Sequence, residues 1–335
     1  MLELLKKLCT IDGTSGDESR VREFIIGEIK DYCEYKTDNL GNLICFKKGN
    51  KTPEHKIMLD AHMDEVGFII TSVTDDGFLK FSTVGGIDTA ALLSKRVKIA
   101  DKVYGVIGCK PMHLLDNENR KKLPPSSQLY IDIGALSKTE ALEKISIGDC
   151  GVFASEFHIL GENVKSKALD DRIGCLILIK LIKEFSDCDF YAVFSTQEEV
   201  GLRGAKASTF SVNPDFAIVL ESTTASDIAD VPDDQSVCNL GEGPAVSFMD
   251  GATVYDKELY NFALASGMCQ PKRAVAGGNN AGSIHLSGDG VRTVAISAPC
   301  RYIHSSSNVA NISDIEKMYE LSKYMLINIA NGKVK

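Results

Sequence analysis

The sequence predicts an α/β fold that is interrupted by a small all-β module. Helical and strand patterns alternate in the first 66 residues and again from residue 163 onward. Between them, short alternating apolar stretches and turn residues replace the helical patterns. The chain has 335 residues, of which 44% are hydrophobic and 25% charged, a composition typical of globular proteins. We therefore expect one discontinuous domain, residues 1–66 plus 163–335, with an inserted domain at 67–162.

The α/β elements can be placed along the chain from their periodicity. Before the insert, Ser15-Gly16-Asp17-Glu18 is a helix-start signal. Helices are predicted over 2–9 and 17–32, and strands over 39–46 and at the start of 56–70. After the insert, helices are predicted over 170–185, 256–267 and 312–330, and strands over 189–195, 216–222 and 291–298.

The insert has a different character. Its apolar stretches are short and evenly spaced: FIITSV, FLKFSTV, RVKIA, VYGVIGC, LYIDI and CGVFAS. Turn residues such as Asp75-Asp76-Gly77, Gly85 and Gly105 separate them. This pattern predicts a barrel-like β module.

Charge and cysteine usage exclude several classes of protein. The net charge of -9 argues against nucleic acid and anionic membranes as partners, because both favour clusters of Lys and Arg. The ten cysteines are scattered without a CxxC pair, so they indicate core thiols rather than a zinc ribbon. No apolar run approaches the length of a membrane span, and MLELLKKLC is typical of an amphipathic helix rather than a signal peptide. A reduced, cytoplasmic location is expected.

Acidic and histidine side chains follow several predicted strands. His62, Asp64 and Glu65 follow the strand that begins at 56, and Glu221 and His304 lie near the ends of later strands. The neighbouring pair Glu198-Glu199 follows another strand, and Asp170-Asp171 begins a helix. Taken singly, each acid has a simpler explanation as a helix cap or a solvated residue.

The coincidence of these residues has a chemical meaning. In open α/β sheets ligands gather beyond the carboxyl ends of strands, so the side chains are expected to share one rim. Such a concentration of negative charge needs cations to neutralise it. Two imidazoles and three carboxylates suit two Zn²⁺- or Co²⁺-like ions, with one carboxylate bridging them. A further carboxylate that is not a ligand would serve as a general base for a bound water.

Four segments carry a resemblance to a known family. They are HMDEVG (62–67), ALDDR (168–172), QEEVG (197–201) and RYIHS (301–305). In this order they resemble the motifs of the M42 family of dinuclear metallo-aminopeptidases, and the likeness covers nearly the whole chain. The resemblance implies a zinc-peptidase-like catalytic domain with a mixed sheet, interrupted by a barrel- or PDZ-like domain that roofs the active site or mediates oligomerisation.

The resemblance also implies roles for residues. His62 and Glu221 would ligate one metal ion, Glu199 and His304 the other, and Asp170 would bridge the two.

Two further acids would act without ligating. Asp64 would orient the imidazole of His62, and Glu198 would be the general base. The cofactors would be two divalent ions per subunit, with Zn²⁺ expected and Co²⁺ or Mn²⁺ as alternatives.

The activity implied is hydrolysis of N-terminal residues from peptides. A dinuclear amidohydrolase that removes acyl groups from small N-acyl compounds is an alternative with the same metal chemistry. An endoglucanase, as some members are labelled, is another, but glycoside hydrolysis commonly uses two carboxylates without a metal. A metal-free binding protein ranks last, because the ligand set is complete. The resemblance further implies homo-oligomers, as dimers that assemble into dodecamers.

One stretch departs from the family pattern. Relatives often carry Thr-Asp where this chain has Asn279-Asn280, within AGGNNAG (276–282). The stretch is expected either to line the substrate cleft, which would alter how the peptide N-terminus is held, or to form a plain turn before a helix. His113 and His285 receive no role from the sequence, although His285 is expected to be packed.

Overall fold

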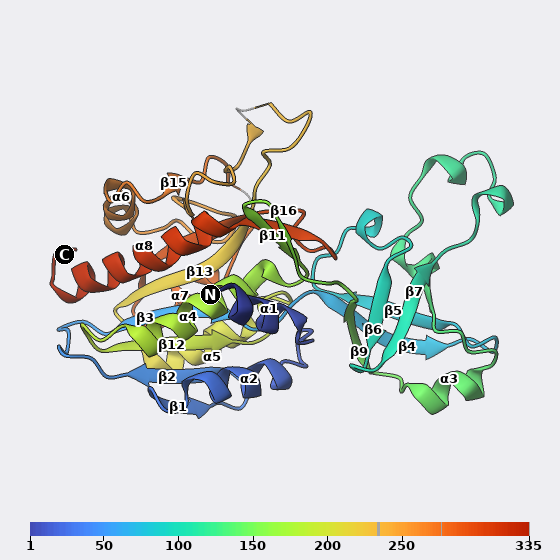
Figure 1. Ribbon diagram of the computed structural model, residues 1–335, viewed down its shortest axis with the longest axis horizontal. Helices are drawn as coiled ribbons and strands as arrows, with labels where there is room; N and C mark the ends of the chain where they lie inside the picture. Colours follow the sequence, from blue (N-terminus) through green and yellow to red (C-terminus); the bar gives the residue numbers. More distant parts are fainter. Residues whose placement is uncertain (233–234, 276, 335) are drawn as a thin grey trace.

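The computed structural model describes residues 1–232, 235–275 and 277–334, and it has two parts. A large mixed sheet covered by helices forms one part, and a closed six-stranded β-barrel lies to one side of it (Figure 1). The predicted fold class, an α/β domain with an inserted all-β module, is therefore confirmed.

The large sheet follows the order β1-β2-β12-β3-β13-β16-β17-β11-β10, with β14 and β15 attached beside β16. Its central strands β12, β3, β13 and β16 are parallel to one another, which brings their carboxyl ends to one rim. The strands are β1 (Glu34–Thr37), β2 (Leu43–Lys47), β3 (Ile57–His62), β10 (His158–Leu160), β11 (Asn163–Ser166), β12 (Phe190–Ser195), β13 (Phe216–Thr224), β14 (Ala245–Val246), β15 (Gln270–Pro271), β16 (Arg292–Arg301) and β17 (Asn308–Asn311).

Helices cover both faces of this sheet. The helices of this part are α1 (Leu2–Thr10), α2 (Ser19–Ile29), α4 (Leu169–Glu184), α5 (Arg203–Val212), α6 (Lys257–Ala265), α7 (Ala281–Ile284) and α8 (Ile312–Ala330). Apolar residues of α1, α2, α4 and α8 share one core with alternate strand residues such as Leu59 and Ile218. Residues of α5 and α7 share a second core with the intervening positions, such as Met58 and Val219. This alternation explains why the central strands are apolar throughout.

The barrel has its own core. Its strands, in the closed order β4-β5-β8-β7-β6-β9, are β4 (Gly67–Val73), β5 (Leu79–Val84), β6 (Arg96–Ile99), β7 (Val103–Gly108), β8 (Tyr130–Asp132) and β9 (Cys150–Phe153). Phe68 packs edge-on against Phe81 and Phe153 at the centre. The six apolar stretches of the insert thus correspond one to one with the six strands. The sequence pattern did not predict helix α3 (Lys138–Lys144) or the short 3₁₀ turns η1 (Thr89–Ala91), η2 (Met112–Leu114), η3 (Asn119–Lys121) and η4 (Ser126–Gln128).

The division into residues 1–66 plus 163–335 and an insert at 67–162 stays a prediction. The barrel strands lie between Gly67 and Phe153, while β10 pairs with β11 in the large sheet. Several polar contacts join the parts: Lys98 Nζ lies 2.7 Å from Asp12 Oδ2, Arg20 Nη1 lies 2.8 Å from Asp101 Oδ2, and Thr14 Oγ1 donates to the carbonyl of Gly151.

One local prediction needs correction, and one helix was missed. Asp170 and Asp171 do not cap α4 in the ordinary way, because both have non-helical φ/ψ and Ala168 occupies the N-cap in the left-handed conformation. The peptide bond between Asp170 and Asp171 is cis. Helix α5, directly after Glu198 and Glu199, was also not predicted, because RGAKASTFSV has small and polar residues and only a short apolar stripe. Among the described residues, no helix is long and apolar enough to cross a membrane.

Candidate metal centre

His62 ends β3 and is held on both sides of its ring. The side chain is 1% exposed. Its Nδ1 lies 3.0 Å from the backbone oxygen of Asp64 and 3.4 Å from Asp64 Oδ1. Its Nε2 faces Asp170 Oδ1 at 3.5 Å and Glu221 Oε2 at 3.4 Å. With the proton on Nδ1, the Nε2 lone pair points at the acids, which is the orientation a metal ligand needs.

Asp170 lies between two imidazoles. Its Oδ1 faces His62, and its Oδ2 lies 3.3 Å from Nε2 of His304. Within the described residues, Oδ1 is buried and has no hydrogen-bond partner. Burial alone would raise the pKa of Asp170, but the two histidines hold it below its usual value. A buried carboxylate with one oxygen toward each histidine has the geometry of a bridging ligand.

Glu199 and His304 form the second half of the cluster. Glu199 Oε2 lies 3.3 Å from His304 Nε2, and His304 donates from Nδ1 to the carbonyl of Gly86 at 2.8 Å. Gly86 follows strand β5, so the barrel helps to orient this imidazole. Burial, followed by the charge of Asp170, raises the pKa of Glu199 to about 8.

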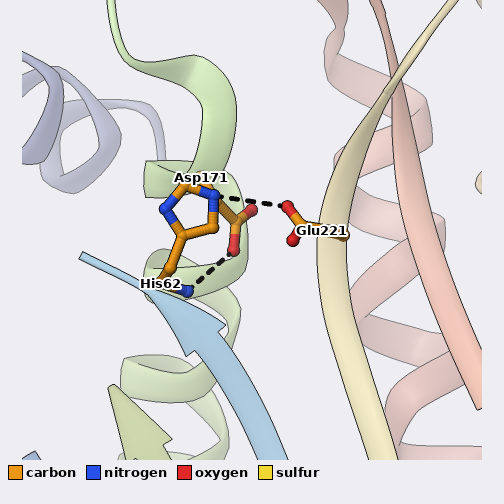
Figure 2. A group of neighbouring side chains, drawn as sticks. All are labelled: His62, Asp171 and Glu221. Carbon is orange, nitrogen blue, oxygen red and sulfur yellow. Dashed lines mark hydrogen bonds and ion pairs between the residues drawn. The ribbon is translucent and has the colours of Figure 1, made fainter. Parts of the chain in front are cut away.

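Glu221 lies in β13, opposite Ser297 of β16. Its Oε2 accepts a hydrogen bond from the backbone of Ser222 and faces His62 (Figure 2). Burial raises its pKa to about 7. The glutamate side chain, which is one methylene longer than that of aspartate, spans the gap from β13 to the His62 imidazole.

Asp171 belongs to the cluster without having been predicted as a site residue. The atoms of His62, Asp171 and Glu221 lie close enough to hold a metal ion, as do those of His62, Asp170 and Glu199. The Asp171 carboxylate, however, accepts a hydrogen bond from the backbone N–H group of His62 (Figure 2). It accepts another from the backbone N–H group of Gly174. It therefore supports the His62 backbone. The only signal in the sequence was its position next to Asp170.

Glu198 lines the same cavity as the cluster. The cavity has a volume of about 460 Å³. Burial raises the pKa of Glu198 well above its usual value, and the charges of Glu221 and Glu199 add to the rise. A raised pKa makes the carboxylate a stronger base than an ordinary glutamate, which is what a proton acceptor needs. The described residues that line the cavity include His62, Asp170, Glu198, Glu199, Glu221, Lys272, Asn279, Ile303 and His304.

Asp64 connects the two strand ends. It accepts hydrogen bonds from Ser15 Oγ at 2.6 Å and from the backbone N–H groups of Glu198 and Glu199 at 3.0 and 3.2 Å. Burial alone would raise the pKa of Asp64, but His62 and these donors hold it below its usual value. One carboxylate thus contacts both the His62 imidazole and the backbone that carries the two glutamates. The contact with Ser15 was not foreseen, because this residue had been interpreted only as part of a helix start.

Other polar residues that the sequence analysis named make their contacts outside the cluster. Glu65 is buried in an ion pair with Lys167 at 2.5 Å, 3.5 Å from Arg172. His285 is half-buried and contacts the carbonyl of Ala281, one turn earlier, through Nδ1 at 2.6 Å. His113 is exposed on the barrel.

The two asparagines that depart from the family pattern differ in environment. Asn279 lines the cavity and donates from Nδ2 to Tyr255 Oη at 3.0 Å. Asn280 is fully buried and donates to Asp60 Oδ1 and Ser195 Oγ. Gly277 and Gly278 also line the cavity, whereas Ala276 lies outside the described residues. The stretch therefore contributes to the cavity wall through its first part and to the core through Asn280.

The donor set fits two metal ions. Imidazole nitrogens and carboxylate oxygens form two groups, one around His62 and one around His304, and Asp170 contributes an oxygen to each. Such ligands suit Zn²⁺, Co²⁺ or Mn²⁺ rather than Ca²⁺ or Mg²⁺. The unpartnered Oδ1 of Asp170 is consistent with a cation at this position.

Comparison with known proteins gives consistent results. The family model described as M42 glutamyl aminopeptidase matches residues 41–321. A putative aminopeptidase of Acetivibrio thermocellus is 42% identical over 96% of this chain and 97% of its own. An aminopeptidase of Desulfurococcus kamchatkensis has a similar structure, with a TM-score of 0.93 and 34% identity over 99% of this chain and 97% of its own. The Pyrococcus horikoshii TET1 peptidase is reported to assemble into a tetrahedron or an octahedral shell. Its structure has a TM-score of 0.85 and 37% identity over 97% of this chain and 98% of its own. This chain therefore belongs to the M42 family of aminopeptidases, which are hydrolases that act on peptides.

Proposed function

We propose that this enzyme is a metal-dependent aminopeptidase with two divalent ions in its active site. The observation that carries the proposal is the position of Asp170, whose two oxygens face two different imidazoles. His62 and Glu221 would hold one ion with Asp170 Oδ1, and His304 and Glu199 the other with Oδ2. The two ions, Zn²⁺ in the first instance and Co²⁺ or Mn²⁺ as alternatives, would supply Lewis acidity and a water of lowered pKa.

The protein's own groups would divide the remaining work. Asp64 keeps the proton of His62 on Nδ1, so that Nε2 stays available as a ligand. The carboxylate of Glu198 would take a proton from the attacking water and then deliver it to the leaving amine. An acidic group of the cavity or one of the metal ions would meet the free α-amine of the peptide, which gives a preference for a free N-terminus. This preference would make the enzyme an exopeptidase acting on N-terminal residues.

The proposal is tested by Glu198→Gln, which keeps the shape of the side chain and removes its basicity. We expect the variant to lose turnover by about 10²–10⁴-fold while it binds two metal ions per subunit, as counted by elemental analysis. Glu242→Gln, the same change at an exposed position, is the matched control. Normal turnover by Glu198→Gln would show that this residue is not the base.

A substrate panel separates the alternative reactions. Chromogenic aminoacyl substrates, N-acyl amino acids and cello-oligosaccharides are assayed after chelation and after addition of each metal. Metal-dependent cleavage of the aminoacyl compounds alone supports the proposal. Cleavage of N-acyl compounds would indicate the deacylase, and chelator-resistant cleavage of oligosaccharides would indicate an endoglucanase.

We further propose that the barrel within residues 67–162 roofs the active site and takes part in oligomerisation. The hydrogen bond from His304 to Gly86 supports the first role. The tetrahedral assembly reported for the Pyrococcus horikoshii enzyme supports the second role, for which we propose dimers that assemble into a dodecamer. A monomer in light scattering at assay concentration would contradict the oligomer.

Peptides are the proposed partners, and the net charge of -9 disfavours nucleic acid. A cytoplasmic location remains a prediction from the sequence.

A further inference from the structure

The loop after β12 is held in an unusual way. Its first four backbone N–H groups, those of residues 196–199, all donate to side chains rather than to backbone carbonyls. Thr196 donates to Asn42 Oδ1 at 2.9 Å, and Gln197 donates to Glu18 Oε1 at 3.1 Å. The N–H groups of Glu198 and Glu199 both donate to Asp64. The position of this loop therefore depends on three side chains from distant parts of the sequence.

Glu18 is the least expected of the three. It occupies the N-cap of helix α2, yet its side chain makes no capping hydrogen bond with that helix. Its Oε1 instead accepts from Gly16 at 2.8 Å and from Gln197. The residue is only 4% exposed, although a glutamate at a helix start is ordinarily solvated. A buried carboxylate directed away from its own helix indicates a function for the contact it makes.

The backbone at Gln197 needs such a contact. Its φ is +54°, in the left-handed region that non-glycine residues seldom adopt. A conformation of this kind persists where its surroundings determine it. On its N–H side, the described contact that holds Gln197 is the hydrogen bond to Glu18. On its carbonyl side, Arg203 N–H donates at 3.2 Å.

We propose that Glu18 is a positioning residue for Glu198. By holding the N–H of Gln197, it fixes the direction in which the chain leaves β12 and so the place of the next residue, Glu198. The inference rests on the proposed function, in which Glu198 transfers the proton. A displacement of about 1 Å at a catalytic group can reduce turnover about 100-fold, so loss of the contact should act on the chemical step rather than on substrate binding.

The test compares Glu18→Ala and Glu18→Gln with the wild type. Glu18→Gln keeps an acceptor oxygen without the charge, and Glu23→Gln, an exposed position on the same helix, is the matched control. For Glu18→Ala we expect kcat to fall about 10–100-fold while KM stays within about 3-fold. Glu18→Gln should retain an intermediate kcat, because its amide oxygen still accepts a weaker bond. Glu23→Gln should match the wild type.

Hydrogen exchange provides a readout that does not depend on activity. In Glu18→Ala, peptides that span residues 196–199 should exchange at least about 10-fold faster, while the barrel strands keep wild-type rates. The proposal is overturned if kcat changes less than 2-fold, if KM carries the whole effect, or if exchange in 196–199 is unchanged. It is also overturned if exchange rises throughout the large-sheet unit and activity falls only with the folded fraction. Should the wild type cleave no aminoacyl substrate, the proposed function fails, and exchange alone then decides whether Glu18 holds the loop.

Discussion

Replacing Arg172 with methionine is expected to lower the free energy of unfolding by about 3–5 kcal/mol. Arg172 is fully buried in α4 and is among the largest such side chains in the described chain. Its guanidinium joins three segments that the sequence keeps far apart: the start of α4, the end of α1 and the turn after β3. Methionine has a similar length but offers no donor.

The magnitude follows from the contacts that would be lost. Arg172 Nε donates to the carbonyl of Met63 at 2.9 Å, and Nη1 donates to those of Leu8 at 2.5 Å and Ile11 at 3.0 Å. A buried polar group left without a partner costs about 1–3 kcal/mol. Glu65 would keep its ion pair with Lys167, so its carboxylate would not be left without a positive partner when the charge of Arg172 is removed. The cavity contribution should be small because methionine fills much of the volume.

Urea denaturation followed by circular dichroism would measure this change. Helices α1, α2, α4, α5, α6, α7 and α8 all lie in the large-sheet unit, so the helical signal reports mainly on it. The chain contains no tryptophan, so tryptophan fluorescence is no substitute. Arg273→Met, at an exposed position, is the matched control and should change stability by less than about 0.5 kcal/mol. A loss below about 1 kcal/mol for Arg172→Met would refute the reasoning that buried carbonyls depend on this guanidinium.

Two further predictions concern the metal centre. In the metal-free protein the pKa values of Glu199 and Glu221 are raised to about 8 and 7, so the folded state binds more protons than the unfolded state between about pH 4.5 and 8. The raised pKa of His62 acts in the same direction above about pH 6.5. Stability of the chelated enzyme should therefore fall as pH rises from 6 to 8; thermal unfolding that is flat or improves over this range would contradict the raised values. His304→Ala should lower the affinity for one of the two metal ions by about 10–100-fold, measured by titration with a metal indicator. Two ions still bound with native affinity would exclude the ligand role of His304.

Much of the fold could be predicted because its signals are local. The helix over 312–330 corresponds to α8, and the strand over 189–195 to β12, since each has a long, regular apolar pattern. Short elements without such a pattern, such as α5 and β1, could not be recognised. Strand β1 is exposed at all four residues and is defined by its pairing with β2 rather than by its own sequence.

The candidate site divides in the same way. The residue types of a metal centre were visible in the sequence, because two histidines and several acids follow strands whose ends meet in a parallel arrangement. The supporting contacts were not visible. Ser15 and Glu18 read as a helix start, and Asp171 as the neighbour of a ligand, yet all three hold site residues through hydrogen bonds.

The sequence alone determined the kinds of side chain at the site, the order of the motifs and the interruption of an α/β unit by a β-barrel. Each of these properties depends on residues close together along the chain, where periodicity and spacing carry the information. Only the tertiary structure decided which oxygen of Asp170 faces which histidine, and which acids support the backbone. Those contacts join residues separated by more than 100 positions, and their distances arise from the packing of strands and loops that no local pattern encodes.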